Sequence, residues 1–148
     1  MSALIKHQKQ PCPVSCMSTA VAMVAGLPAG TVRRQMHDRY RNKGLSLRQM
    51  LDELEIPFTS FDTCDNGKLD MVGAWLCTMP SLNTPGGTHA VVIEVTAKTW
   101  HILDPNRGRK GMKFYIKRGT RARNGVELGG FTVDAYVCYS WLRDRTHV

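Results

Sequence analysis

Along the first sixty positions, apolar residues recur at helical rather than strand spacing. Residues 16–25 (CMSTAVAMVA) are almost all small and apolar, with no polar face of their own. Gly26 and Pro28 follow at once, and both residue types end helices. The pattern predicts a short helix over 16–25 that is buried on most of its sides.

Two further helices are predicted downstream of this first one. Thr31 can cap a basic helix over 31–40 whose apolar residues share one face: Val32, Met36 and Tyr40. Ser46 begins a third helix, because Ser46 and Gln49 have the spacing of a capping box. Pro57 marks the exit from this helix.

Beyond the third helix the pattern becomes mostly that of β-strands. A short helix is expected over 69–76, and strands are expected over 56–61, 77–82, 113–117 and 131–141. Residues 90–95 (AVVIEV) and 99–103 (TWHIL) flank a short turn and predict a hairpin. Because helices come first and antiparallel strands second, we expect an α+β fold with the helices packed on an antiparallel sheet.

Composition narrows the class of protein without naming a function. The chain has 148 residues, 43% of them hydrophobic, which predicts one domain over 1–148 and excludes collagen, coiled coil and disorder. The longest uncharged apolar stretch, 16–28, is shorter than the roughly 20 residues of a membrane span, and no signal peptide is visible. Five cysteines form no pairing framework. We therefore expect a cytoplasmic protein with reduced thiols and no membrane insertion.

The positive charge is concentrated in the last third of the chain. Residues 1–106 carry ten Lys/Arg and nine Asp/Glu, a net charge of +1. Residues 107–148 carry ten Lys/Arg and three Asp/Glu, a net charge of +7, so that the whole chain has a net charge of +8. Eight cations and no acid lie between 107 and 123: Arg107, Arg109, Lys110, Lys113, Lys117, Arg118, Arg121 and Arg123. This basic segment is either a solvated hairpin face or a recognition surface for an acidic protein or nucleic acid.

Cys16 is the first candidate for chemistry, because it lies at the predicted start of the first helix. Unpaired backbone N–H groups and the helix dipole favour a thiolate there, and the thiolate is the nucleophilic form of cysteine. Pro11 and Pro13 keep the preceding segment extended. Many cysteines at helix starts are merely small buried residues, so the position alone does not establish catalysis.

A nucleophilic thiol needs a base, and the base needs a group that orients it. His89 lies immediately before the apolar strand 90–95, where its direction is fixed while a cleft can still reach it. Asp104 ends the following strand, fifteen residues after His89. Gln10 lies six residues before Cys16 and could donate an amide N–H to an oxyanion.

These residues fall in three segments that resemble the C39 peptidases. Residues 10–23 (QPCPVSCMSTAVAM) look like the family's nucleophile segment, and residues 43–51 resemble its Gly-x-Ser-Leu helix start. His89 and the residues that follow it (HAVVI), with residues 102–108 (ILDPNRG), are similar to its His-x-Val-Val and Leu-Asp-Pro-x-x-Gly segments. The resemblance covers about residues 8–111, and the order of its pieces makes it more specific than any piece alone.

C39 peptidases are papain-like cysteine peptidases that trim double-glycine leader peptides, usually as a domain of an ABC exporter. The resemblance implies that Cys16 is the nucleophile and His89 its ion-paired base. Asp104 would orient the imidazole, and Gln10 would complete the oxyanion hole with the Cys16 backbone N–H. It implies a papain-like fold, hydrolysis of a peptide or isopeptide bond, and no cofactor. The same machinery could perform acyl transfer or deamidation.

The sequence departs from the family at several places. Ser15 stands where the family usually has Asp, Met17 where it usually has Gly, and the match fades after Gly108, where the basic segment continues. We therefore expect a protein or peptide substrate, with an acidic one favoured by the basic segment, rather than a double-glycine leader specifically.

Three alternatives stay open. The chain could be a non-catalytic module of peptidase fold that binds a protein partner or nucleic acid. Phe114 and Tyr115 within the basic segment could offer a stacking surface to nucleic acid, although in a strand only one of them would face outward. Cys12 and Cys16 could ligate zinc with a histidine, or could form a regulatory disulfide.

Overall fold

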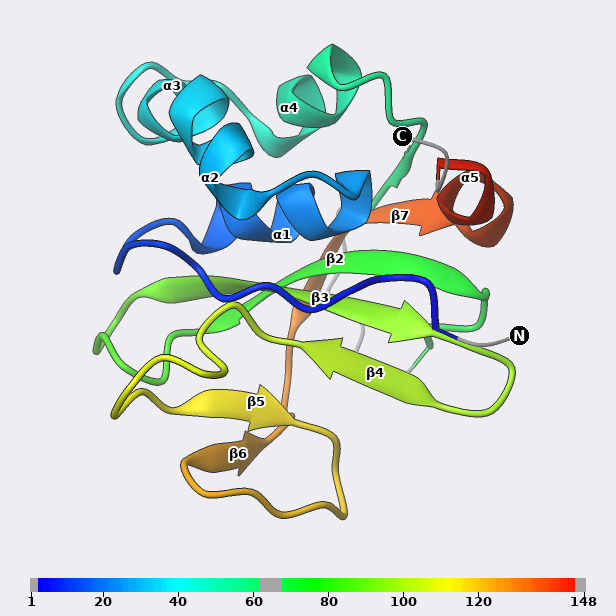
Figure 1. The fold of residues 1–148 in the computed structure, drawn as a ribbon. Coiled ribbons are helices and arrows are strands. Elements are labelled where there is room, and N and C mark those ends of the chain that lie inside the picture. The colour runs from blue at the N-terminus through cyan, green and yellow to red at the C-terminus, as the bar shows by residue number, and fades with distance from the viewer. Residues whose placement is uncertain (1–2, 62–67, 146–148) are drawn as a thin grey trace.

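A computed structural model describes residues 3–61 and 68–145 of the chain. Its centre is a five-stranded antiparallel sheet in the order β1-β7-β2-β3-β4 (Figure 1). The strands of this sheet are β1 (Thr59–Ser60), β2 (Gly73–Pro80), β3 (Thr88–Val95), β4 (Trp100–Leu103) and β7 (Thr132–Cys138). Two short strands, β5 (Phe114–Ile116) and β6 (Gly125–Glu127), pair in parallel as a separate ribbon. The α+β arrangement and the antiparallel sheet expected from the sequence are both present.

The helices cover one face of the sheet, and the β5–β6 ribbon lies on the other side (Figure 1). They are α1 (Cys16–Ala25), α2 (Ala29–Val32), α3 (Asp38–Asn42), α4 (Leu47–Glu53) and α5 (Tyr139–Asp144). A π-helical turn, Arg33–His37, joins α2 to α3. In Figure 1, α1 lies directly on the sheet with α2, α3 and α4 above it. No helix in the described ranges is long and apolar enough to cross a membrane.

Helix α1 has the bounds that its composition predicts. Gly26 ends it in the left-handed conformation with φ 75°, donating its N–H to the carbonyls of Ala22 and Met23. The helix is buried from Ser18 to Ala25, because the sheet lies below it and other helices lie above it. A helix enclosed in this way needs no polar face, which explains its uniformly small, apolar sequence.

Apolar cores lie on both faces of the sheet. Val92 and Leu76 pack against the helices, whereas Val91, Ile93 and Trp75 pack on the opposite side. Strands β2 and β3 are therefore covered on both faces, and continuous apolar runs replace the alternation typical of a half-exposed strand. Of the three tryptophans in the chain, Trp75 is buried, while Trp100 and Trp141 are half-buried.

The helix expected over 69–76 is wrong, because strand β2 begins at Gly73. This strand lies between β7 and β3, and it is buried on both faces, so its sequence carries no alternation to identify it. Gly73 adopts φ 147°, and a Cβ there would lie 2.4 Å from the carbonyl oxygen of Val137. Glycine at this position lets two strands approach and is not a helix signal.

Three other element boundaries also differ from expectation. The second helix begins at Ala29 after Pro28, so Thr31 lies inside it and is not its cap. The last strand ends at Cys138, after which residues 139–144 turn into α5. Strand β6 is not among the strands expected from the sequence. By contrast, both hydrogen bonds of the Ser46–Gln49 capping box form, at 3.1 and 2.8 Å.

Candidate active site

Three elements bring the predicted catalytic residues together. Cys16 is the first residue of α1, His89 is the second residue of β3, and Asp104 directly follows β4. Because α1 packs on β3 and β4 pairs with β3, the three positions converge at one edge of the helix–sheet interface. The hairpin predicted over 90–103 is confirmed, and its register places Val92 opposite Leu103, beside the site.

Asp104 is fully buried and holds the site together through its carboxylate. Oδ1 accepts a hydrogen bond from His89 Nε2 at 2.5 Å and another from the backbone N–H of Asn106 at 2.8 Å. Oδ2 accepts the backbone N–H of Tyr115 at 2.8 Å. Charge-assisted hydrogen bonds of this kind make a buried carboxylate tolerable. Asp104 therefore fixes the orientation of His89 without being exposed to solvent.

His89 is 5% exposed and lies between Asp104 and Cys16. Burial alone would lower the pKa of His89, but its hydrogen bonds with Asp104 and Cys16, together with their charges, raise the pKa to about 9. Because the Asp104 carboxylate only accepts, His89 Nε2 carries a hydrogen, which leaves Nδ1 for the thiol. The imidazole is thus held in the tautomer that a Cys–His pair needs.

The Cys16 thiol is half-buried beside His89. Burial raises its pKa, but hydrogen bonds from the His89 side chain and from backbone groups of Ala90 and Met17 outweigh that effect. The net result is a pKa below the ordinary value for a thiol. Since the pKa of His89 is raised and that of Cys16 is lowered, each favours the charged form of the other, as in a thiolate–imidazolium pair.

Gln10 is buried in the segment that precedes α1. Its backbone N–H donates to the carbonyl of Pro105 at 2.9 Å, which joins the segment before α1 to the loop that follows Asp104. Its Nε2 donates to the carbonyl of Cys12 at 2.9 Å, and its Oε1 has no partner among the described residues. One N–H of the Gln10 amide is therefore committed to the backbone, and its role at an oxyanion stays a prediction.

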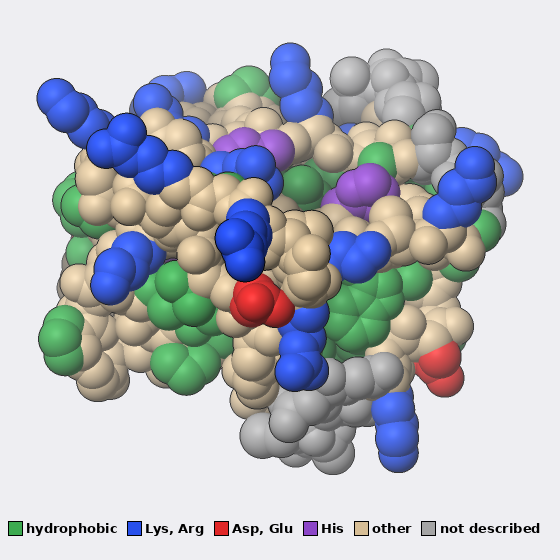
Figure 2. Space-filling model, turned by 90° about the horizontal axis from the view of Figure 1, so that it is seen from below, with side chains coloured by type: hydrophobic (Ala, Val, Ile, Leu, Met, Phe, Trp, Pro, Cys, Tyr) green, Lys and Arg blue, Asp and Glu red, His purple; other side chains and the backbone are tan. Residues whose placement is uncertain are grey.

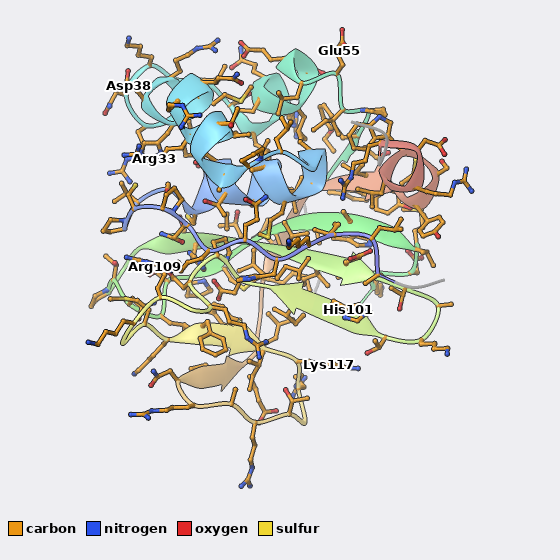
Figure 3. All side chains as sticks on the ribbon, in the orientation of Figure 1. Arg33, Asp38, Glu55, His101, Arg109 and Lys117 are labelled. Atoms are coloured by element: carbon orange, nitrogen blue, oxygen red, sulfur yellow. The ribbon has the colours of Figure 1, made fainter. Side chains whose placement is uncertain are left out.

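Asn106 is a residue of the site that the sequence reasoning missed. Its backbone N–H binds Asp104, and its Nδ2 lies 3.5 Å from His89 Nε2. Its Oδ1 accepts a hydrogen bond from Arg109 Nη1 at 2.8 Å, and Figure 3 places Arg109 at the end of the sheet where this loop lies. Arg109, one of the cations of the basic segment, thus contacts a residue of the site. The Asp-x-Asn spacing, typical of an Asx turn, is the signal that could have identified Asn106.

The N-terminal segment also supports the site. His7 Nε2 lies 2.7 Å from the backbone carbonyl of Asp104. Glu94 of β3 is 1% exposed, and its carboxylate accepts the backbone N–H groups of Leu4 and Ile5 at 2.7 and 3.1 Å. These contacts hold residues 4–7 along the sheet and lead the chain to Gln10. Glu94, a charged residue inside an apolar strand, is the one local sequence signal for these contacts.

A hollow of about 510 Å³ opens beside Met17, the neighbour of Cys16. Its walls include Tyr40, Leu47, Thr78 and Asp134. Thr78 lies opposite Ala90 in the β2–β3 register, so the hollow lies close to His89 as well. Burial raises the pKa of Asp134 despite a 2.6 Å hydrogen bond from Thr78. The hollow therefore lies beside the residues that follow Cys16 and His89 in the chain.

Cys12 is a second thiol with a lowered pKa near the start of α1. Although burial acts in the opposite direction, hydrogen bonds with Ser15 and Arg33 lower the pKa of Cys12 to about 7. Arg33 Nε lies 3.4 Å from its sulfur. Cys12 and Cys16 are both free thiols, so the disulfide between them is not formed in this structure. An experiment that labels Cys16 must therefore distinguish its labelling from that of Cys12.

The basic segment, residues 107–123, lies in the loops around β5. Among the described residues, none of its eight cations forms an ion pair with a carboxylate. Arg107 stacks over the ring of Phe114 at 5.2 Å from its centroid. Phe114 and Tyr115 are only 8% and 6% exposed, so the expectation that one of them faces outward is wrong: Tyr115 packs into an apolar core, and Arg107 lies over the ring of Phe114. These two aromatics offer no stacking surface to nucleic acid.

Metal binding and family membership receive no further support. Across residues 3–61 and 68–145, no three His, Cys, Asp or Glu side chains are grouped as metal ligands would be. Cys64, one of the scattered cysteines, lies outside the described residues. Comparisons of the chain with protein-family models, with curated proteins and with solved structures find no match.

Proposed function

We propose that this protein is a papain-like cysteine hydrolase that cleaves a peptide or isopeptide bond. The observation that carries the proposal is that buried Asp104 holds His89 through a 2.5 Å hydrogen bond while His89 and Cys16 shift each other's pKa toward the charged pair. Cys16, His89 and Asp104 come from three different parts of the chain, and their order and spacing resemble those of the C39 segments. A nucleophile, a base and an orienting carboxylate are the elements of acyl-transfer chemistry.

In the proposed mechanism, the Cys16 thiolate attacks the carbonyl carbon and its lone pair forms the new C–S bond. The carbonyl oxygen becomes an oxyanion at the N-terminus of α1, where the Cys16 backbone N–H and the Gln10 amide would stabilise it. His89 then donates its Nδ1 proton to the departing amine. In the second half, His89 takes a proton from water, which attacks the thioester and releases the acid.

The test of this proposal is the pH dependence of Cys16 alkylation by iodoacetamide. We expect the inflection of the Cys16 profile to lie at lower pH than that of glutathione, because the hydrogen bond and charge of His89 lower the pKa of Cys16 despite its burial. In H89A the inflection should move up to that of an ordinary thiol. The site of labelling is quantified by peptide mass spectrometry.

Cys12 requires a matched control, because its pKa of about 7 would give reactivity of its own. The profile is therefore measured in C12S, with C12S/C16S as the blank. A Cys16 profile that coincides with that of glutathione would rule out the hydrolase. It would leave the chain as a binding module of the same fold.

A further inference from the structure

Strand β4 is an edge strand, and a groove runs along it. In the five-stranded sheet β4 pairs only with β3, so its other side is not hydrogen-bonded to a strand of that sheet. The groove has a volume of about 360 Å³ and is enclosed by residues 100–103 on one side. On the other side are Arg107, residues 116–117 and residues 120–122. Exposed strand edges are templates to which an extended peptide can add.

An apolar pocket of about 320 Å³ lies at one end of this groove and shares Trp100, Ile102 and Lys117 with it. Its floor consists of Leu128 and Phe131, which are buried. Lys117 and Arg118, both exposed, line the same pocket. The pocket is large enough to take one large aliphatic or aromatic side chain, with cations beside it.

Charge distinguishes this groove from an ordinary strand edge. Arg107, Lys117 and Arg121 line it, and within the described chain none of them is neutralised by a carboxylate. Figure 2 shows this side of the molecule with Lys and Arg side chains spread between hydrophobic patches and few acidic ones. In Figure 3, Lys117 lies on the side of the sheet where β5 and β6 are, away from the helices. The field over the groove is therefore positive.

The groove also leads toward the candidate active site. Arg107 lies at one side of it, and the backbone N–H of Arg107 donates to the carbonyl of Asp104 at 3.0 Å. A chain lying along β4 would reach the loop that holds Asp104 within a few residues, since a strand advances roughly 3.3 Å per residue. The groove therefore ends beside the loop that orients His89.

We propose that this groove is a docking site for an extended acidic segment of a polypeptide, anchored by one large apolar side chain in the Trp100 pocket. That the segment belongs to the substrate rests on the proposed function, whereas the binding itself does not. The apolar pocket favours a peptide over nucleic acid, because phosphates need no such pocket and the aromatic side chains of Phe114 and Tyr115 are buried.

The experiment is a fluorescence anisotropy titration of the full chain carrying C16A. The probe is a fluorescein-labelled peptide of glutamates around a central leucine. Matched peptides replace the leucine with serine or the glutamates with glutamines. We expect the acidic leucine peptide to bind at least about tenfold more tightly than either matched peptide, because anchor and charge both contribute.

Single substitutions locate the binding. K117E, which reverses a charge in both hollows, should weaken binding at least about tenfold, and added salt should weaken it further. K110E reverses an exposed charge outside both hollows and should change the affinity less than about twofold. Binding should also change the fluorescence of Trp100, and W100F should remove that change.

Three results would overturn the docking site: equal binding of the serine peptide, equal loss in K110E and K117E, or tighter binding of a single-stranded oligonucleotide. These results differ from those that would refute the hydrolase proposal. Peptide binding with ordinary Cys16 alkylation would remove the hydrolase and keep the groove. A low-pH alkylation profile without peptide binding would do the reverse.

Discussion

Two regions that are neighbours in sequence are built on opposite principles. Around Asp104, charge is buried and each carboxylate oxygen has a hydrogen-bond partner. From Arg107 to Arg123, all cations except the half-buried Arg109 are exposed, and none has a carboxylate partner among the described residues. The first region acts through fixed geometry, so single atoms matter there. The second acts through its summed field, to which each cation contributes a part.

The largest effect is expected from D104N, which keeps the shape of Asp104 and removes its charge. The free energy of unfolding should fall by about 3 kcal/mol, because the amide group cannot accept all three hydrogen bonds that the carboxylate accepts. The pKa of His89 should fall with it, and Cys16 alkylation at pH 6 should slow at least about tenfold. Urea unfolding and labelling measure the two effects.

The matched control for D104N is D52N, which changes an exposed carboxylate on α4. It should leave stability and labelling unchanged. If D104N behaves like D52N, the Asp104 network does not hold the site, and the contrast between the two regions fails.

An intermediate effect is expected from E94Q, which loosens the N-terminal segment. The unfolding free energy should fall by about 2 kcal/mol, because a carboxylate that accepts two backbone N–H groups becomes an amide with one acceptor. Residues 4–7 should become accessible to limited proteolysis, while Cys16 alkylation should slow less than in D104N. E55Q changes an exposed carboxylate that points to solvent in Figure 3 and is the control. Unchanged proteolysis in E94Q would contradict the role given to Glu94.

Local sequence patterns predicted the parts of the site that depend on local physics. The start and end of α1 follow from composition and from Gly26, and the hairpin follows from its two apolar runs and the turn between them. Together these elements bring Cys16, His89 and Asp104 to one edge. Strand β2 was misread, because a central strand covered on both faces loses the alternation that identifies strands.

The supporting residues were harder to predict, because their partners lie far away in sequence. Glu94 binds Leu4 and Ile5, and His7 binds the carbonyl of Asp104, each across about ninety residues or more. No periodicity links such positions, since the fold alone brings them together. Cys12 also escaped attention as a reactive thiol, because Arg33 reaches it from another helical segment.

The smallest effect, and the sharpest test of the comparison, concerns Arg109. It belongs to the basic segment in sequence, yet it donates to Asn106 and so takes part in the buried network. R109Q should lower the unfolding free energy by about 1 kcal/mol, since the hydrogen bond from the half-buried Arg109 to the buried Asn106 is lost. Cys16 alkylation at pH 6 should slow about two- to fivefold, because a network of this kind acts on His89 as a unit.

K110Q removes an equal charge from the next position in the chain, where the side chain is exposed and makes no such contact. If geometry governs the site, K110Q leaves both stability and labelling unchanged, and added salt does not reproduce the effect of R109Q. If the field of the basic segment governs Cys16 instead, both variants slow alkylation equally, and salt slows it in the unaltered chain. The same pair of variants therefore decides to which of the two regions Arg109 belongs.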